Sequence, residues 1–340
     1  MTSLSSYPWH ICGVGAIGSL WASALITRGS NVTLLLRDAD QLTQYQTAGG
    51  VNLLEDDDQI HTQPNAVTPS NPPHEQIKHM LVCCKSYATL GAVLPWRKHM
   101  ADDTQIVLLQ NGMGSAQALQ RLMPNANIYC ATSTDGAWRK GPFDVVRAGI
   151  GETFIGSFSD HLLEAEIPSS IQSLLDTNQG NYNSNNKTKS PTPILNISWH
   201  TDIRTPMWHK LAINSVINAL TAIYQCSNGE LINHPQGRLR LEQLCRETQD
   251  VMARVGIVPL GQGLLKTALR ILQQTALNKS SMLQDCQAGR PTEIATINGY
   301  IIEHGALYHL PCAGHKQVCE DLQHACAPPS QSHKNQTNLV

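Results

Sequence analysis

Net charge, aromatic residues and long apolar segments are all scarce in this sequence. The 24 Lys and Arg residues nearly balance the 26 Asp and Glu residues, which leaves a formal net charge of -2. A chain with so little excess charge has no strong field to gather nucleic acid or an anionic membrane. No segment has the uninterrupted apolar length of a membrane span. We therefore expect a small-molecule partner, and neither a nucleic-acid nor a membrane partner.

The first residues also lack the features of an export signal. The run over 11–26 is apolar, but no Lys or Arg precedes it and three glycines interrupt it. A secretory signal begins instead with a positively charged segment. The run is typical of a strand, a turn and a helix, and we expect a cytoplasmic protein.

Paired cysteines of the C-x-x-C type are absent too. The ten cysteines are scattered along the chain, and we expect reduced thiols. Cys312, Cys319 and Cys326 recur every seven residues with His315 and His324 between them. This spacing is compatible with a metal cluster, and equally with one face of a helix. We expect no metal.

The first half of the chain alternates short apolar runs with helical patterns. A length of 340 residues exceeds what a single core usually serves, so two domains are expected. Runs that read as buried strands lie at 9–12, 32–36, 80–84, 106–109 and 128–131. Helical patterns between several of them predict a doubly wound α/β domain. A further strand over 149–156 and a helix over 162–175 follow.

The second half changes in character. Residues 177–193 are polar and predict a long flexible loop, and a short strand is expected over 194–199. Helical periods follow at 207–224, 239–255, 263–277 and 293–304. We therefore expect a Rossmann-type domain over 1–199, an all-α domain over 200–327 and a disordered tail over 328–340.

A glycine motif follows the first predicted strand directly. Its residues, Gly13-Val14-Gly15-Ala16-Ile17-Gly18, open an apolar helix. The glycines allow a tight turn, a close approach of the backbone to a pyrophosphate, and close packing of helix on sheet, while the helix N-terminus offers N–H groups to phosphates. Because strand, motif, helix and second strand come in the correct order, the sequence predicts a dinucleotide site.

The second predicted strand ends in Leu36-Arg37. An NAD enzyme usually carries Asp or Glu at this point to bind the ribose, whereas a guanidinium suits the 2'-phosphate of NADP. Two alternatives stay open: Arg37 is a solvated loop charge, or Asp38 is the ribose ligand. We favour NADPH as the cofactor.

Two further strand ends carry polar residues. Lys85 follows the strand over 80–84, and Asn111 follows the strand over 106–109. Ligands of doubly wound sheets bind beyond the carboxyl ends of the strands, so both residues are candidates for cofactor or substrate contacts. Taken singly, each also fits a turn.

A polar stripe interrupts the first helical segment of the second half. Lys210, Asn214 and Asn218 are spaced by four and so share one helical face. Reduction of a carbonyl builds negative charge on oxygen, for which a positioned Lys can supply a proton. The stripe fits a lined cleft, and it also fits a solvated or capping face.

Polar residues recur near the last predicted helix. Asn278, Ser280 and Ser281 can hold a carboxylate or hydroxyl, and Glu293 can orient an ammonium group or a cofactor hydroxyl. As the alternative, Ser281 or Thr292 caps a helix and Glu293 is a first-turn carboxylate favoured by the helix dipole.

Taken in order, these motifs resemble the ketopantoate reductase family, also called 2-dehydropantoate 2-reductases, over nearly the whole chain. The similarity rests on the glycine motif and on the segments Lys85-Ser86, Gln110-Asn111-Gly112-Met113-Gly114, Trp208-His209-Lys210-Leu211-Ala212, Asn228-Gly229-Glu230-Leu231, Ser281-Met282-Leu283-Gln284-Asp285 and Thr292-Glu293-Ile294.

The resemblance implies NADPH-dependent reduction of ketopantoate to pantoate, on the route to pantothenate and coenzyme A. It implies that Lys210 is the proton donor and that Glu293 helps to organise the reacting groups. It assigns NADPH contacts to the glycine motif and to Arg37, Lys85, Asn111, Ala137 and Glu293. It assigns substrate contacts to Lys210, Asn214, Asn218, Asn228, Asn278 and Ser281.

Three other functions compete with this one. The chain is a reductase of another small keto acid on the same fold, since a few side chains decide the substrate; or it is a non-catalytic NADPH sensor, against which Lys210 argues; or it is a thiol or metal protein. A monomer or a homodimer is expected.

Overall fold

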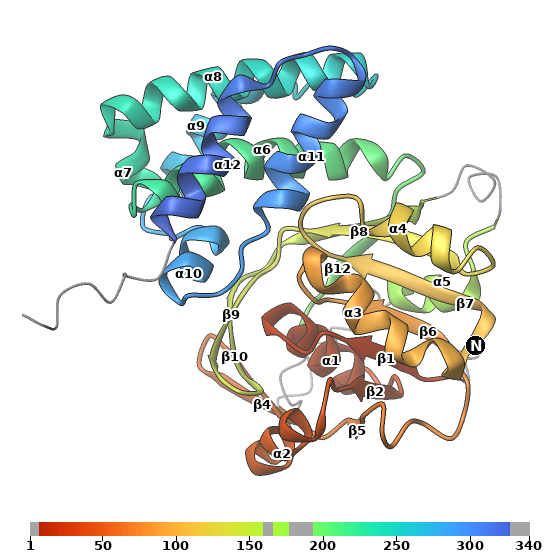
Figure 1. The fold of residues 1–340 in the computed structure, drawn as a ribbon. Helices are drawn as coiled ribbons and strands as arrows, with labels where there is room; N and C mark the ends of the chain where they lie inside the picture. The colour runs from red at the N-terminus through yellow and green to blue at the C-terminus, as the bar shows by residue number, and fades with distance from the viewer. Residues whose placement is uncertain (1–6, 159–165, 177–192, 327–340) are drawn as a thin grey trace, which may run out of the picture. The chain divides into compact units, whose positions relative to one another are not determined.

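The computed structural model describes residues 7–158, 166–176 and 193–326. They belong to two compact units, Met1–Met207 and Trp208–Val340. The first unit contains sheets and helices, and the described part of the second contains helices alone (Figure 1). The predicted fold class, an α/β Rossmann-type domain followed by an all-α domain, is therefore confirmed. The predicted tail over 328–340 and all but the last residue of the loop over 177–193 lie outside the described residues.

The first unit is built from the following elements. Its strands are β1 (Trp9–Cys12), β2 (Val32–Leu35), β3 (Val51–Glu55), β4 (Asp58–Thr62), β5 (Asn65–Val67), β6 (Ile77–Val82), β7 (Met100–Leu109), β8 (Asn127–Ser133), β9 (Gly136–Gly141), β10 (Asp144–Gly149), β11 (Glu152–Ser157) and β12 (Asn196–Trp199). Its helices are α1 (Ala16–Thr27), α2 (Ala39–Ala48), η1 (Ser86–Ala88), α3 (Thr89–Val93), η2 (Leu94–His99), α4 (Ser115–Leu122) and α5 (Ser169–Leu175).

The main sheet has the order β12-β11-β8-β7-β6-β1-β2-β5. Its neighbouring strands pair in parallel, except that β11 runs antiparallel to β8. From β1 the chain moves to β2 and β5 on one side and then crosses to β6 and β7 on the other. This reversal puts a topological switch point between β1 and β6, where doubly wound sheets bind their ligands.

The central strands of this sheet are buried on both faces. Alternate residues point to opposite faces, so Ile11 and Leu81 join one core with α1 and α5, while Cys12 and Met80 join another with α3 and α4. Figure 1 shows α3 and α4 lying along the sheet. Burial on both sides explains why these strands read as continuous apolar runs rather than alternating ones.

A second sheet, β4-β3-β10-β9, was not identified in the sequence. Its strands β3, β4 and β10 bury alternate positions, β9 buries none, and all four strands pack against α1. Arg147 of β10 joins this sheet to its surroundings, because Nη1 donates to Glu55 (2.9 Å) and Nη2 donates to Asp135 (2.7 Å). The Arg147 and Asp135 side chains are both almost fully buried, and such a pair is tolerated only where hydrogen bonds compensate the lost hydration.

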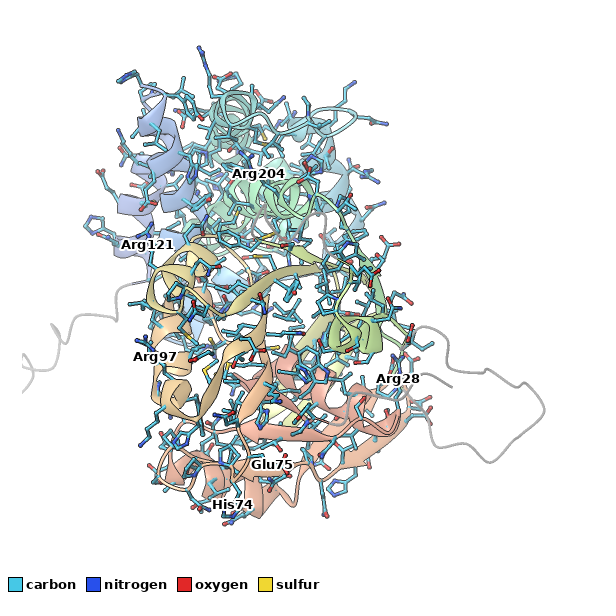
Figure 2. The ribbon with its side chains drawn as sticks, turned by 90° about the vertical axis from the view of Figure 1, so that its right-hand side faces the viewer. Arg28, His74, Glu75, Arg97, Arg121 and Arg204 are labelled. Carbon is cyan, nitrogen blue, oxygen red and sulfur yellow. A yellow bond between two sulfur atoms is a disulfide. The ribbon has the colours of Figure 1, made fainter. Side chains whose placement is uncertain are left out.

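Arg28 is the C-cap residue of α1 (Figure 2), and its side chain binds a distant part of the chain. Its Nη2 donates to the carbonyl oxygen of Pro193 at 2.9 Å, across 165 residues of sequence. This bond links the end of α1 to the segment that leads into β12. The sequence alone offers no sign of such a distant pairing.

The second unit consists of packed helices. They are α6 (Arg204–Ile223), which starts in the first unit, and α7 (Asn228–Asn233), α8 (Pro235–Arg254), α9 (Leu264–Gln274), α10 (Ser281–Gln287), α11 (Ile294–Leu307) and α12 (Ala313–Ala325). In the described ranges, no helix has both the length and the apolar character that crossing a membrane requires.

A buried polar network ties four of these helices together. His315 of α12 is fully buried; its Nε2 lies 2.9 Å from Thr248 Oγ1 on α8, and its Nδ1 lies 3.1 Å from Asn298 Nδ2 on α11. The Asn298 amide also donates to the carbonyl oxygen of Ser215 on α6 (2.8 Å). Since Asn298 Nδ2 is a donor, Nδ1 of His315 is the acceptor and Nε2 carries the proton. The network therefore needs a neutral imidazole.

One pair of cysteines corrects the expectation of reduced thiols. Cys286 of α10 and Cys326 at the end of α12 form a disulfide, with their Cα atoms 5.0 Å apart. The two residues are 40 positions apart in sequence, so no local pattern indicates the pairing. Cys312, Cys319 and Cys326 do belong to one helix and its caps, as the seven-residue repeat allowed.

We predict that two buried histidines make the protein less stable in mild acid. Burial lowers the pKa of His10 and of His315 to about 4. Between the ordinary pKa of about 6.5 and this lowered value the unfolded chain binds more protons, so stability falls as the pH falls through this range. At pH 5 each residue costs about 2 kcal/mol of the free energy of unfolding.

Urea denaturation at pH 7 and pH 5 measures this effect. His315→Gln should lose about 2 kcal/mol less than the wild type between the two pH values. His74→Gln, at an exposed position (Figure 2), should match the wild type. An unchanged pH dependence in His315→Gln would contradict the assignment.

Candidate functional site

The three glycines of the β1–α1 turn have different surroundings. Gly13 has a φ of +90°, and a Cβ added to it would lie 2.3 Å from the backbone nitrogen of Cys84. A Cβ on Gly18 would lie 2.3 Å from the carbonyl oxygen of Gly13, whereas a Cβ on Gly15 would meet no heavy atom within 4 Å. Gly13 thus allows the tight turn, Gly18 allows the first turn of α1 to pack closely on that turn, and Gly15 faces open space. This is the division of roles expected of a pyrophosphate-binding turn.

The N-terminus of α1 is open to an anion. Gly15 is its N-cap, and among the described residues no side chain caps it and no acidic residue stands in its first turn. The first N–H groups of a helix have no partner within the helix, and they carry the positive end of the dipole. The turn therefore fits a diphosphate.

The other residues of the glycine motif are apolar and face inward. Val14 is buried, and Ala16 and Ile17 pack on the same core as Ala137 of β9. Their side chains belong to the core, so contacts with a dinucleotide would come from their backbone groups.

Lys85 and Asn111 lie at the neighbouring carboxyl ends of β6 and β7. Between them, Gln110 Nε2 donates to the carbonyl oxygen of Cys84 (2.8 Å) and to Thr89 Oγ1 (2.7 Å). Thr89 Oγ1 in turn donates to the carbonyl oxygen of Ser86 (2.8 Å). Because Gln110 precedes Asn111 and Cys84 precedes Lys85, one side chain fixes both turns.

Arg37 and Asp38 follow β2 and contact one another. Arg37 Nε donates to Asp38 Oδ2 at 2.6 Å, and 83% of the Arg37 side chain is exposed. Asp38 caps α2 by accepting a hydrogen bond from the backbone N–H of Gln41 (2.8 Å). The Arg37 guanidinium, followed by the Gln41 N–H, lowers the pKa of Asp38. The carboxylate is thus already engaged, while the guanidinium faces solvent.

Three buried thiols of the main sheet and its turns are held in the protonated form. Burial raises the pKa of Cys12 and of Cys83 well above the ordinary thiol value, and that of Cys130 to about 12. Protonated thiols are poor nucleophiles and poor metal ligands. Among the described residues, no group of three or more His, Cys, Asp or Glu could hold a metal ion.

In the helical unit, α6 carries the predicted polar stripe. Lys210 and Asn214 are partly buried and Asn218 is 8% exposed. Trp208 is 1% exposed and packs on Tyr300 and His304, with ring centroids 5.6 Å and 5.5 Å apart. Residues two apart lie on nearly opposite sides of a helix, so the buried tryptophan directs Lys210 away from these rings.

The end of the stripe meets the N-terminus of α10. Thr221 Oγ1 donates to Ser280 Oγ (2.7 Å), and Ser280 Oγ lies 3.4 Å from the carbonyl oxygen of Asn218. Ser280 also caps α10 by accepting from the N–H of Leu283 (3.1 Å). The cap is therefore Ser280, and Ser281 is the exposed first residue of the helix.

Asn228 and Asn278 are brought together by the backbone. The N–H of Asn228 donates to the carbonyl oxygen of Asn278 at 3.0 Å. Because Asn278 lies two residues before Ser280, the structure gathers Asn218, Asn228, Asn278 and Ser281 around the start of α10. On α6, Asn214 lies about one turn before Asn218, and Lys210 lies about two turns before it.

Glu293 stands immediately before α11. It is 4% exposed, and its side chain does not cap the helix, although its carbonyl oxygen accepts from the N–H groups of Thr296 and Ile297. The residue is therefore a buried carboxylate rather than the solvated first-turn carboxylate of the alternative interpretation.

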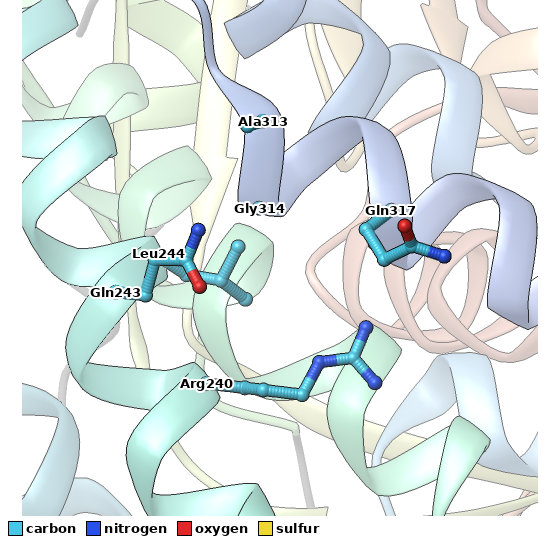
Figure 3. Close-up of a pocket in the computed structure, with 6 residues that line it drawn as sticks. All are labelled: Arg240, Gln243, Leu244, Ala313, Gly314 and Gln317. Carbon is cyan, nitrogen blue, oxygen red and sulfur yellow. The ribbon is translucent and has the colours of Figure 1, made fainter.

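A cavity of about 270 Å³ lies elsewhere in the helical unit, between α8 and α12 (Figure 3). None of the predicted site residues lines it. Its polar side chains already have partners: Arg240 and Gln317 bind Asp321, and Gln243 binds Glu247. We therefore do not assign the substrate site to this cavity.

Four further residues support predicted site residues through hydrogen bonds: Gln110, Thr89, Thr221 and Ser280. Gln110 belongs to a motif identified in the sequence, and Ser280 is one of the hydroxyl residues named before the last predicted helix. Thr89 was not singled out, because it belongs to none of the motifs in the sequence.

Two family models match the chain. "Ketopantoate reductase PanE/ApbA" matches residues 9–160, and "Ketopantoate reductase PanE/ApbA C terminal" matches residues 202–325. Among curated proteins, the 2-dehydropantoate 2-reductase of Shigella flexneri is 33% identical over 297 residues, which cover 86% of each chain. That of Salmonella typhimurium is 30% identical over 311 residues, which cover 91% of this chain and 92% of the relative.

Solved structures share the fold. A ketopantoate reductase from Ralstonia eutropha JMP134 has a TM-score of 0.79 at 22% identity, and covers 94% of this chain and 98% of its own. A D-mandelate dehydrogenase, solved with NADH and anilino(oxo)acetate, has a TM-score of 0.81 at 20% identity, with the same coverage.

The two family matches follow the two units in order, and the curated relatives extend over most of both chains. The chain belongs to the ketopantoate reductase family, whose members are oxidoreductases that act on a CH–OH group with a nicotinamide cofactor.

Proposed function

We propose that the protein reduces 2-dehydropantoate (ketopantoate) to pantoate with NADPH, in the biosynthesis of pantothenate and coenzyme A. The observation that carries the proposal is the polar stripe on α6, where Lys210, Asn214 and Asn218 share one face and are flanked by apolar residues such as Leu211 and Ile217. A stripe of one cation and two amides suits a substrate that has a carboxylate, a carbonyl and a hydroxyl group.

Lys210 would act as the general acid. NADPH, when bound, would supply the hydride to the C2 carbonyl carbon, and the negative charge that develops on the oxygen needs a proton. An ammonium group within hydrogen-bond reach stabilises that charge and then donates the proton. Trp208 supports this role, because its packing fixes the first turns of α6.

The remaining predicted residues would bind the substrate or help to organise the reacting groups. Asn214, Asn218, Asn228, Asn278 and Ser281 would hold the substrate, and Glu293 would help to organise the reacting groups and the cofactor.

On the cofactor side, the glycine turn would hold the pyrophosphate on the N-terminus of α1. Lys85, Asn111 and Ala137 would contact or support the cofactor. The exposed Arg37 guanidinium would bind the 2'-phosphate of NADPH, since Asp38 is engaged as a helix cap and is not free to bind a ribose.

A second candidate is a reductase of another small 2-keto acid. The fold also serves a D-mandelate dehydrogenase that was solved with NADH, and substrate choice depends on a few side chains rather than on the fold. A non-catalytic NADPH sensor would have no use for Lys210.

Gel filtration would decide between monomer and homodimer; a ketopantoate reductase of the same fold from Staphylococcus aureus is dimeric.

The direct test is the oxidation of NADPH by the purified protein. Ketopantoate should be turned over far faster than pyruvate or 2-ketoisovalerate, and NADPH should be used in preference to NADH. Turnover of another acid in place of ketopantoate would favour the second candidate. Saturable NADPH binding without turnover of any acid would favour the sensor.

We predict that Arg37→Asp abolishes the preference for NADPH. Charge-assisted bidentate hydrogen bonds contribute about 1.5–3 kcal/mol, so the KM for NADPH should rise about 10- to 100-fold while that for NADH changes little. Steady-state kinetics with both cofactors measure this. Arg97→Asp is the matched control, because η2 lies at the amino end of β7, away from the ligand-binding edge. An unchanged preference in Arg37→Asp would rule out the phosphate contact.

We also predict that Lys210→Ala loses turnover but keeps the cofactor. Loss of a general acid lowers kcat by about 10²- to 10⁴-fold, whereas NADPH affinity, measured by fluorescence titration, should remain. Lys266→Ala on α9, where the side chain is exposed, should behave as the wild type. Wild-type turnover in Lys210→Ala would remove Lys210 as the acid.

A further inference from the structure

The Asn228 side chain has one buried atom without a partner. Asn228 begins α7 and is 8% exposed, and its Nδ2 donates to Thr275 Oγ1 at 2.8 Å. Its Oδ1 is buried and accepts no hydrogen bond from any residue that the structure describes. Buried polar atoms are nearly always paired, so an unpaired acceptor beside a binding site indicates that a ligand supplies the donor.

Thr275 determines which atom of the amide is left over. A threonine hydroxyl has a single hydrogen, and Thr275 Oγ1 donates it to the carbonyl oxygen of Ile271 at 2.6 Å. Toward Asn228 the hydroxyl oxygen is therefore an acceptor. Only the NH₂ group of Asn228 can face it, which turns Oδ1 toward the unpaired side.

The backbone around this pair is fixed. The N–H of Gly229 donates to the carbonyl oxygen of Ala276 at 2.9 Å, and a Cβ at Gly229 would lie 2.8 Å from that of Ala276. Ser227 and Glu230 form a capping box at the start of α7. With the backbone so constrained, rotation of the Asn228 amide is the freedom that remains, and Thr275 removes it.

We propose that Thr275 is a positioning residue that sets substrate specificity. It holds the Asn228 amide with Oδ1 as an acceptor, so the site favours a 2-keto acid that carries a hydroxyl donor over the same acid without the hydroxyl. The proposal rests on the proposed function, because it takes Asn228 as a substrate ligand. A site built to accept a hydrogen bond discriminates strongly against an analogue that leaves its acceptor unpaired.

Ketopantoate and 3,3-dimethyl-2-oxobutanoate form a matched pair for the test, since they differ only in the hydroxyl. The quantity measured is the ratio of kcat/KM for ketopantoate to that for the deoxy analogue. Thr275→Val removes the hydroxyl and keeps the shape of the side chain. It should lower this ratio by about 10-fold or more, through kcat/KM for ketopantoate, with little change for the analogue.

Two variants control for structure. Thr275→Ser keeps the hydroxyl and should keep the ratio. Thr275 is the C-cap residue of α9, and Thr267 lies within the same helix. The Thr267 hydroxyl donates to the carbonyl oxygen of Gly263 (2.9 Å) in the same manner, so Thr267→Val should also leave the ratio unchanged. If Thr275→Val does not fold, Thr275→Ala replaces it, because it lacks the hydroxyl and adds no bulk.

The outcomes separate the two hypotheses. A wild type that reduces ketopantoate, with an unchanged ratio in the Thr275 variants that lack the hydroxyl, overturns the role of Thr275 alone. An equal loss on both substrates also overturns it, because that result indicates a structural role. A wild type that reduces neither acid overturns the proposed function itself.

Discussion

The proposed cofactor site depends on one constraint, the close approach of the backbone turns that follow β1 and β6 at the switch point of the sheet. Gly13 lies so near Cys84 that a side chain on Gly13 would overlap the backbone. In the same region the N–H of Cys83 donates to the carbonyl oxygen of Cys12 at 2.7 Å. Since the β1 and β6 ends meet here, the glycine turn, the N-terminus of α1 and Lys85 all lie at one edge of the sheet. Displacing either turn would disturb the whole edge.

The helical unit depends instead on a buried network of hydrogen bonds. His315, Thr248, Asn298 and the Ser215 carbonyl join four helices. Directional bonds between buried groups favour one arrangement of these helices over others. The position of Lys210 is therefore set partly by residues that need not touch any ligand.

Much of this arrangement was predictable from the sequence, and the limits have physical causes. Strands buried on both faces, such as β1, show as continuous apolar runs, and the amphipathic period locates α6 and α8 within a few residues. The second sheet was missed because its strands are short and mostly polar, and because the pairing of β3 with β10 joins segments that are remote in sequence. The Cys286–Cys326 bond and the contact between Arg28 and Pro193 depend on tertiary proximity alone. Family motifs indicated Asn228, but only the hydrogen bonds indicate how its amide is oriented.

Gln110 has a consequence for how the site responds to change. Its side chain spans the turns after β6 and β7, so the segments that carry Lys85 and Asn111 share one support. Residues with a common support do not make independent energetic contributions. The coupling energy from a double-mutant cycle between Lys85 and Asn111 would therefore include their common support by Gln110 as well as any ligand that they share. Their separate effects on cofactor binding would not sum.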